Sequence, residues 1–190
     1  MNVVSLFGSP RQKSNSAALT NHFLSRLEEK GAHVDRYYLN KMNYRGCQGC
    51  MGCKGASDRC VLKDDLAPVL DQMKDTDLLV ISSSVYYGDV TSQMKGFIDR
   101  IYSFYVPEFW MKDAKSRLPG GKKILFVLTQ GNGDESLYGD IALKYAALVK
   151  VHGFDEDYLL RVCGASPAGN ILDDKKVIAQ ADALAESILK

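Results

Sequence analysis

The sequence predicts an α/β fold in which one parallel sheet is covered by helices on both faces. Apolar runs typical of buried strands alternate with amphipathic segments from one end of the chain to the other. A turn rich in serine, with one glycine, directly follows the first run. With 190 residues, of which 46% are apolar and 25% charged, the chain is expected to form one domain, residues 1–190, with one core.

Five runs are predicted to be strands, and the segments that follow them are predicted to be helices. The strands are expected at residues 3–7, 33–39, 78–83, 123–129 and 157–162. The helices are expected at residues 15–29, 65–73, 92–105, 136–151 and 174–189, where apolar side chains recur every three or four positions. One ligand-binding turn straight after the first strand favours a five-stranded parallel sheet of order 2-1-3-4-5, the flavodoxin-like three-layer sandwich.

Charge and hydropathy argue against several classes of partner. The net charge is +1 and the basic residues are interspersed with acids, so no block attracts nucleic acid or anionic lipid. No apolar run is long enough to span a bilayer. The first residues lack a basic segment before their apolar run, which predicts a buried strand rather than a signal peptide. We therefore expect a cytoplasmic protein with no nucleic-acid and no membrane partner.

The turn after the first predicted strand, residues 8–16, is rich in groups that bind phosphate. It offers hydroxyls, an amide and positive charge at the start of a helix, on Ser9, Arg11, Ser14, Asn15 and Ser16. A plain capped turn, the simpler interpretation, needs fewer such groups. The Walker A lysine, the dinucleotide fingerprint, a loop cysteine nucleophile and an acidic phosphoacceptor cluster are all missing here, which leaves a single phosphomonoester such as that of FMN.

Two further loops can face a flat ring bound beside that phosphate. The loop after the third strand offers an aromatic wall, a glycine and polar groups, on Val85, Tyr86, Tyr87, Gly88 and Asp89. The loop after the fourth strand includes Thr129 and Gly131. Taken alone, two tyrosines at the start of a helix could simply pack on the sheet edge. Because the three loops follow strands whose carboxyl ends share one edge, we expect them to converge on one crevice.

Four of the five cysteines lie in a long connection, residues 40–63, and are spaced like cluster ligands. They are Cys47, Cys50, Cys53 and Cys60. Two-residue gaps let successive thiolates wrap a [4Fe–4S] cluster, and the fourth ligand follows a short distance on. A zinc site, disulfide bonds and a motif that no longer assembles its cluster are the alternatives. Cys163 is interpreted as a buried hydrophobic residue.

Three motifs in combination resemble the NAD(P)H-dependent FMN reductase family. They are the 8–16 loop, the Val85-Tyr86-Tyr87-Gly88 segment and the run from Met94 to Arg100. The cysteine loop, with Asp64-Asp65 after it, resembles the iron–sulfur flavoprotein branch. The resemblance covers nearly the whole chain. It implies that FMN binds with its phosphate at residues 9–16 and its ring at residues 85–89 and 129–131, and that a [4Fe–4S] cluster lies beside the flavin.

The function implied is an NAD(P)H-dependent reductase that passes electrons through FMN to flavin, a quinone or a protein acceptor, and through the cluster where it is present. The flavin supplies the chemistry, so no catalytic side chain is expected; Asp99 and Arg100 are interpreted as a structural pair. A non-enzymatic electron carrier and a cluster-based redox sensor are the alternatives. The connection 106–121 carries Phe109, Trp110 and Met111, which either cover the flavin or, as the resemblance favours, contact another subunit of a homodimer or homotetramer.

Overall fold

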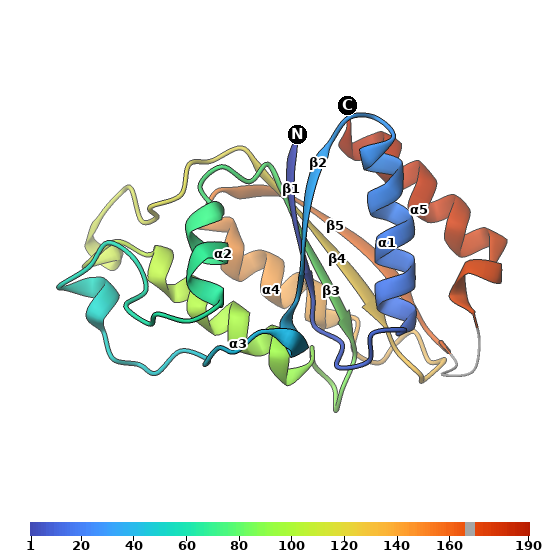
Figure 1. Ribbon diagram of the computed structural model, residues 1–190, viewed down its shortest axis with the longest axis horizontal. Helices are drawn as coiled ribbons and strands as arrows, with labels where there is room; N and C mark the ends of the chain where they lie inside the picture. The colour runs from blue at the N-terminus through green and yellow to red at the C-terminus, as the bar shows by residue number, and fades with distance from the viewer. Residues whose placement is uncertain (166–169) are drawn as a thin grey trace.

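The computed structural model describes residues 1–165 and 170–190, and a parallel sheet of order β2-β1-β3-β4-β5 forms its centre (Figure 1). The strands are β1 (Asn2–Phe7), β2 (His33–Tyr38), β3 (Leu78–Ser84), β4 (Lys122–Thr129) and β5 (Phe154–Val162). The helices are α1 (Asn15–Glu28), α2 (Leu66–Gln72), α3 (Ser92–Arg100), α4 (Asp140–Lys150) and α5 (Lys175–Ile188). The predicted flavodoxin-like fold and its strand order are confirmed.

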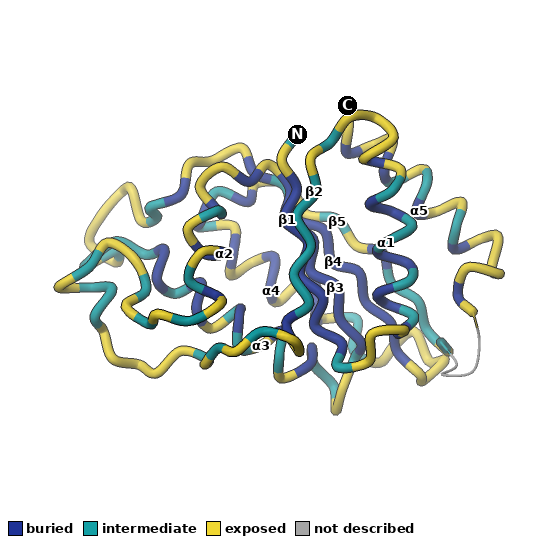
Figure 2. Tube along the Cα trace, viewed as in Figure 1, coloured by how far each residue is buried: buried dark blue, intermediate teal, exposed yellow. Residues whose placement is uncertain are grey.

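Two hydrophobic layers hold the helices to the sheet. Alternate residues of a strand point to opposite faces, so Val3 and Val80 pack beneath α1 and α5, whereas Val4 and Ile81 pack beneath α2, α3 and α4. All seven residues of β3 are buried, as expected for the central strand of a covered parallel sheet (Figure 2). None of the helices in the described ranges combines the length and the apolarity that crossing a bilayer requires.

Three element boundaries differ from the predicted ones by three or more residues, and the others agree to within one. Helix α3 ends at Arg100 and continues as a tighter 3-10 turn at Ile101–Phe104. Helix α4 begins at Asp140 instead of 136, because Tyr138 has a positive φ of 65° that a right-handed helix excludes. Strand β5 begins at Phe154, three residues earlier than predicted, because Phe154 and Glu156 already pair with β4 although Glu156 is exposed and acidic.

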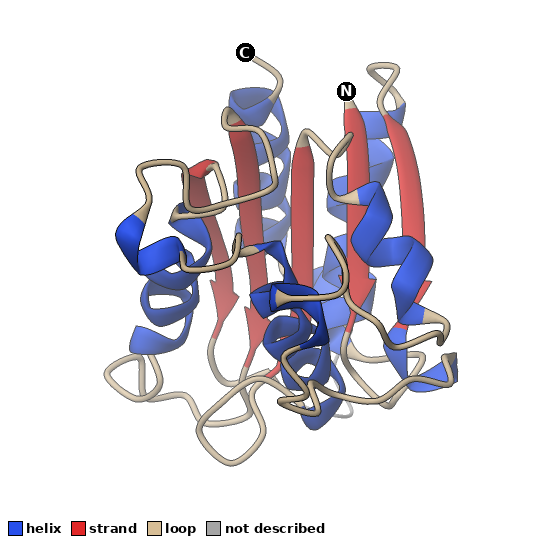
Figure 3. Cartoon of the chain, turned by 90° about the vertical axis from the view of Figure 1, so that its left-hand side faces the viewer, coloured by secondary structure: helices blue, strands red, loops and turns tan. Residues whose placement is uncertain are grey.

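The connection 106–121 packs against the turn that follows α3, on the side of the molecule where the cysteine loop also lies (Figure 3). The Phe109 ring stacks on Tyr105 with centroids 4.0 Å apart. Arg117 donates a hydrogen bond to the carbonyl of Cys53 at 2.8 Å. This segment therefore contacts the cysteine loop. Trp110 and Met111 are 65% and 77% exposed, and the predicted subunit contact through them stays a prediction.

His152, which follows α4, joins that helix to the connection 106–121. Its Nδ1 lies 3.1 Å from Ser116 Oγ, and its ring meets the Tyr105 ring edge-on at 4.4 Å. The side chain is only 1% exposed. Burial, helped by the positive charge of Lys54, lowers the pKa of His152 to about 4. The folded protein therefore holds this imidazole neutral.

We expect this histidine to make the fold sensitive to mild acid. Between pH 6.5 and about 4 the unfolded chain binds a proton at His152 that the folded chain excludes, so stability falls as pH falls through this window, by up to about 3 kcal/mol. Chemical denaturation at stepped pH measures the slope. His152→Gln should flatten it, whereas His33→Gln, at an exposed position of β2, should not. An unchanged slope in His152→Gln would contradict the assignment.

Candidate functional site

The loop between β1 and α1 gathers serine hydroxyls at the carboxyl edge of the sheet. Ser14 is the N-cap of α1, and its Oγ accepts a hydrogen bond from the Ala17 amide at 3.2 Å. The same Oγ lies 3.2 Å from Ser16 Oγ, which lies 3.5 Å from Ser84 Oγ at the end of β3. The hydroxyls of Ser14 and Ser16 thus lie together and connect the loop to the neighbouring strand, where the sequence predicts a phosphate.

The cationic and amide groups of the same loop lie on its outer side. Arg11 and Lys13 are exposed, and the Arg11 amide donates to Ser9 Oγ at 3.3 Å. Lys13 and Asn15 line a cleft of about 400 Å³ together with Asn170, which precedes α5. Positive charge at a helix N-terminus favours an anion, so this loop has the electrostatics that a phosphate site needs.

Thr91, which sequence reasoning did not single out, joins this loop to the loop after β3. Its Oγ1 donates to the Gly8 carbonyl at 2.7 Å and accepts from the Met94 amide as the N-cap of α3. A Cβ on Gly8 would lie 2.8 Å from both Thr91 Oγ1 and Met94 Cβ, so only glycine permits this approach. The sequence could have indicated Thr91 as a helix cap, because a threonine precedes an amphipathic run. Its hydrogen bond to Gly8 could not be read from the sequence, because it depends on the pairing of β1 with β3.

Tyr86–Asp89 form a tight turn in which both central residues have positive φ. Tyr86 and Asp89 exchange backbone hydrogen bonds of 2.8 and 3.2 Å. Tyr87 has φ of 50° and Gly88 has φ of 84°, the pattern of a type I′ turn. Glycine adopts this conformation freely, whereas a tyrosine is strained in it. The Tyr87 side chain is fully exposed at the tip of the turn.

The loops after β3 and β4 are held side by side. The Val85 amide donates to the Thr129 carbonyl at 2.8 Å, and Gly131 is exposed just beyond. Asp89 accepts hydrogen bonds from Lys144 Nζ and Tyr145 OH of α4, both at 2.8 Å. Burial alone would raise the pKa of Asp89, but these bonds and one from the Val90 amide lower it. Asp89 is thus an anchor for the turn, and the three predicted cofactor loops follow neighbouring strands at one edge.

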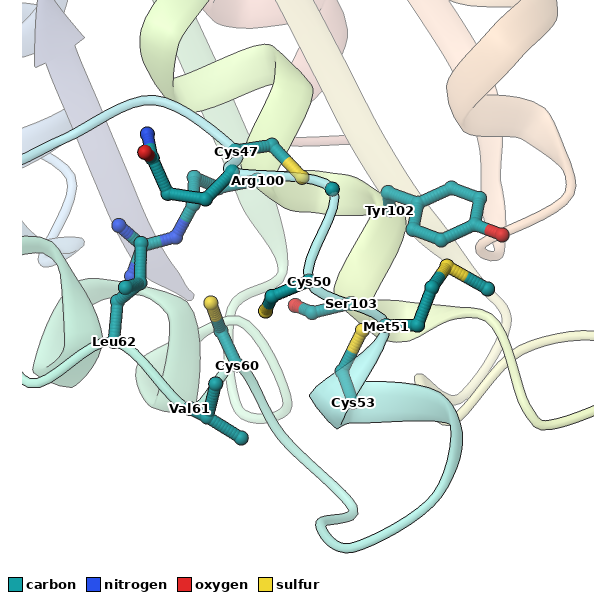
Figure 4. Close-up of a pocket in the computed structure, with 12 residues that line it drawn as sticks. Cys47, Cys50, Met51, Cys53, Cys60, Val61, Leu62, Arg100, Tyr102 and Ser103 are labelled. Atoms are coloured by element: carbon teal, nitrogen blue, oxygen red, sulfur yellow. The ribbon is translucent and has the colours of Figure 1, made fainter.

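The four clustered cysteines line one small pocket of about 30 Å³ (Figure 4). Cys47 and Cys50 are exposed, Cys53 and Cys60 are half-buried, and all are free thiols. In residues 1–165 and 170–190, no group of three or more histidine, cysteine or carboxylate side chains is arranged to hold a metal ion. The cysteines therefore share a pocket, and their role as iron ligands stays a prediction. Cys163 is also half-buried, so its interpretation as a buried residue was wrong.

Arg100, the last residue of α3, fixes the position of the cysteine loop. Its guanidinium binds the Asp64 carboxylate with both terminal nitrogens, at 2.8 and 3.2 Å, and donates to the Arg45 carbonyl at 2.8 Å. The predicted pairing of Arg100 with Asp99 was wrong. Asp99 pairs with Lys95 one turn earlier, because consecutive residues of a helix point about 100° apart and cannot face each other.

Two further cations surround the cysteine pocket. Lys54 Nζ lies 3.5 Å from Cys53 Sγ and donates to the carbonyls of Tyr102 and Tyr105, both at 2.8 Å. Burial lowers the pKa of Lys54 and the neighbouring Cys53 thiol acts to raise it. Arg117 holds the Cys53 carbonyl from the other connection. Arg100 is thus the cation that lines the pocket, and Lys54 and Arg117 add positive charge beside Cys53, which favours an anionic occupant.

Comparison with known proteins identifies the family. The sequence profile of the NADPH-dependent FMN reductase family matches residues 1–148, which include all three predicted flavin loops and the cysteine loop. This chain belongs to that family. Among curated relatives of this family member, iron-sulfur flavoproteins of Archaeoglobus fulgidus and Methanocaldococcus jannaschii are each 34% identical, over 107 and 100 residues. These matches cover 55% and 53% of this chain, and 47% and 50% of the relatives. The chain thus spans about half the length of the curated relatives that it matches.

Solved structures confirm the fold of this reductase-family chain. An NAD(P)H:quinone oxidoreductase from Methanothermobacter marburgensis superposes with a TM-score of 0.75 at 19% identity, over 100% of this chain and 98% of the other. An FMN-dependent NADH-azoreductase from Bacillus anthracis, solved with FMN, gives 0.73 at 15% identity over 100% of both chains. At these identities the likeness concerns the flavodoxin-like fold alone.

We expect Tyr87→Gly to separate stability from cofactor binding. Removing a side chain from the left-handed region should raise the free energy of unfolding by about 1 kcal/mol, and the loss of an aromatic ring should weaken FMN binding. Denaturant unfolding and titration of FMN fluorescence measure the two effects. Glu108→Gly, at φ of 54° in the other long connection, is the matched control and should stabilise without changing FMN affinity. Unchanged FMN affinity in Tyr87→Gly would remove this side chain from the site.

Proposed function

We propose that this chain is an oxidoreductase that takes electrons from NAD(P)H through bound FMN and passes them to free flavin, a quinone or a protein acceptor. The observation that carries this proposal is the grouping of the serine-rich loop with two further loops at one edge of the sheet, in a chain of the FMN reductase family. We also propose that the cysteine loop holds a [4Fe–4S] cluster and that the protein works in the cytoplasm, where thiols stay reduced.

The chain's own groups give each part of FMN a complementary environment. Ser9, Ser14 and Ser16 would donate hydroxyl hydrogen bonds to the phosphate, with Asn15 and Arg11 beside it. The turn at 85–89 would supply backbone donors and acceptors along the ring edge, with the rings of Tyr86 and Tyr87 as an apolar cover. Thr129 and Gly131 would bound the ring from the next loop. When bound, FMN supplies the exchange between hydride and single-electron transfer.

The chemistry of the cysteine pocket fits a thiolate-bound cluster. The four thiols of Cys47, Cys50, Cys53 and Cys60 share a pocket that Arg100 also lines, and Lys54 Nζ lies 3.5 Å from the Cys53 sulfur. In the described part of the chain, Arg100 Nε is one of two buried polar side-chain atoms that lack a hydrogen-bond partner, the other being Ser5 Oγ of β1. An orphaned cationic N–H beside sulfur atoms is stabilised by an anionic group in the pocket. The curated relatives are themselves named iron-sulfur flavoproteins.

Arg11→Gln tests the phosphate site. The exposed guanidinium should contribute to binding of the phosphate but not of the ring, so FMN affinity should fall about tenfold while riboflavin affinity stays unchanged. Fluorescence titration with both ligands measures the difference. Lys30→Gln removes an equally exposed charge beyond the other end of α1 and is the control. Equal losses for FMN and riboflavin would place the phosphate elsewhere.

Anaerobic reconstitution tests the cluster, and turnover tests the enzyme. Iron and sulfide analysis with an absorption spectrum should report about four of each per chain in the wild type. Cys60→Ser should lose most of the iron, and Cys163→Ser, which changes the cysteine outside the loop, should keep it. NADH and NADPH oxidation with free FMN or a quinone should be measured in parallel.

The outcomes separate the alternatives. A flavin spectrum without iron after reconstitution would remove the cluster and leave the reductase. FMN binding without turnover by either nicotinamide would favour a non-enzymatic electron carrier. A cluster with FMN and only very slow turnover would favour a redox sensor that acts on a protein partner.

A further inference from the structure

Among residues 1–165 and 170–190, Arg100 is the largest fully buried side chain, and one nitrogen of its guanidinium is unused by the fold. The residue is 1% exposed. Its two terminal nitrogens are occupied by Asp64 and by the Arg45 carbonyl, but Nε has no partner in the part of the chain that the structure describes. Leaving a charged donor buried and unpaired is costly. The structural role of Arg100, which is to hold Asp64, therefore accounts for the terminal nitrogens and not for Nε.

The unpaired side of this guanidinium is turned to the cysteine pocket. Arg100 lines that pocket and lies beside Cys60 (Figure 4), whereas Asp64 does not line it. Burial acts to lower the pKa of Arg100, and Asp64 together with the Cys60 thiol raises it above its ordinary value. The ion pair is thus oriented, with its positive end toward the sulfur of Cys60 and its negative end away from it.

We propose that Arg100 is a positioning residue whose unpaired Nε–H donates to the sulfur of Cys60 once the cluster is bound, and thereby raises the reduction potential of that cluster. This inference rests on the proposed cluster and adds a residue outside the ligand set. Hydrogen bonds to cluster sulfurs and nearby positive charge both favour the reduced, more negative state. Arg100 stays charged at all physiological pH values, so its effect is permanent.

The burial of Arg100 makes its influence on the pocket stronger than that of Arg59, an exposed cation of the same loop. Coulomb interactions are screened little between buried groups and strongly at the surface. Arg59 lies next to Cys60 in sequence, but its guanidinium is exposed and paired with Asp58 and Asp71. Arg59 therefore offers the same charge on the same loop without the buried contact.

The experiment compares midpoint potentials of reconstituted wild-type, Arg100→Gln, Asp64→Asn and Arg59→Gln proteins by anaerobic titration followed by electron paramagnetic resonance. Arg100→Gln should lower the equilibrium constant for one-electron reduction at least about tenfold, which is a shift of about 59 mV. Asp64→Asn removes the opposing negative charge and should raise that constant. Arg59→Gln should change it by less than about threefold. Iron content and thermal unfolding are measured on every variant.

The sign of the shift distinguishes tuning from simple anchoring. If Arg100 only anchors Asp64, then Arg100→Gln and Asp64→Asn break the same pair and must change stability and potential alike. Opposite shifts in potential, with lower stability in both, support the proposal. Should Arg100→Gln fail to fold, Arg100→Lys keeps the charge but lacks Nε, and its potential should still fall below that of the wild type.

Two results would overturn the inference, and they differ from each other. A wild type that binds the cluster with the same potential as Arg100→Gln or Arg100→Lys overturns the role of Arg100 and leaves the cluster in place. A wild type that takes up no iron overturns the cluster and this inference together, while FMN binding and reductase turnover remain to be judged by their own assays.

Discussion

Helix α3 is held at both ends by interactions that also fix two loops, the serine-rich loop and the cysteine loop. At its start, Thr91 binds the Gly8 carbonyl and fixes the serine-rich loop against β3. At its end, the buried guanidinium of Arg100 binds Asp64 and fixes the cysteine loop. A buried cation requires partners, because an unpaired charge in the interior costs several kcal/mol. The ion pair therefore fixes the backbone around Asp64 at the end of α3, whatever path the 40–63 connection takes before it.

This arrangement links the two proposed cofactor sites through one rigid element. The nine residues of α3 span about 13 Å, so Thr91 and Arg100 lie roughly that far apart. The flavin loops gather at the carboxyl edge of the sheet, and the cysteine loop runs along the outer side of the helix layer (Figure 1). A change at either end of α3 is expected to reach the other site through the helix rather than through flexible loops.

Two of the four non-glycine residues with positive φ in the described ranges lie at these two sites, and cations gather at one of them. Tyr87 adopts a left-handed backbone conformation, and its ring is exposed to solvent. Met51, inside the cysteine loop, also adopts a left-handed backbone conformation. Such residues weaken the fold and persist where the surroundings hold them, which is typical of binding sites. Cations, Lys54 among them, also lie close together beside the cysteine pocket, although the burial of apolar surface does not require them there. Both features agree with sites built for ligands rather than for stability.

The sequence by itself determined the fold class, the strand order, the family and the loops at which the predicted site residues lie. It could do so because strands and helices have local periodicities, and because carboxyl ends of parallel strands share one edge. Where it failed, the deciding contact was distant in the chain. Residues 99 and 100 are neighbours in sequence but bind Lys95 and Asp64.

Only the tertiary structure could decide the links of Thr91 to Gly8 and of Arg100 to Asp64, since these contacts span 83 and 36 residues. It also decided that the connection 106–121 packs on the cysteine loop. Local pattern names the cysteines as ligands, but the charges around their pocket come from three separate segments, at Lys54, Arg100 and Arg117. The choice of the predicted site residues therefore rests on local information, and their electrostatic environment is a property of packing.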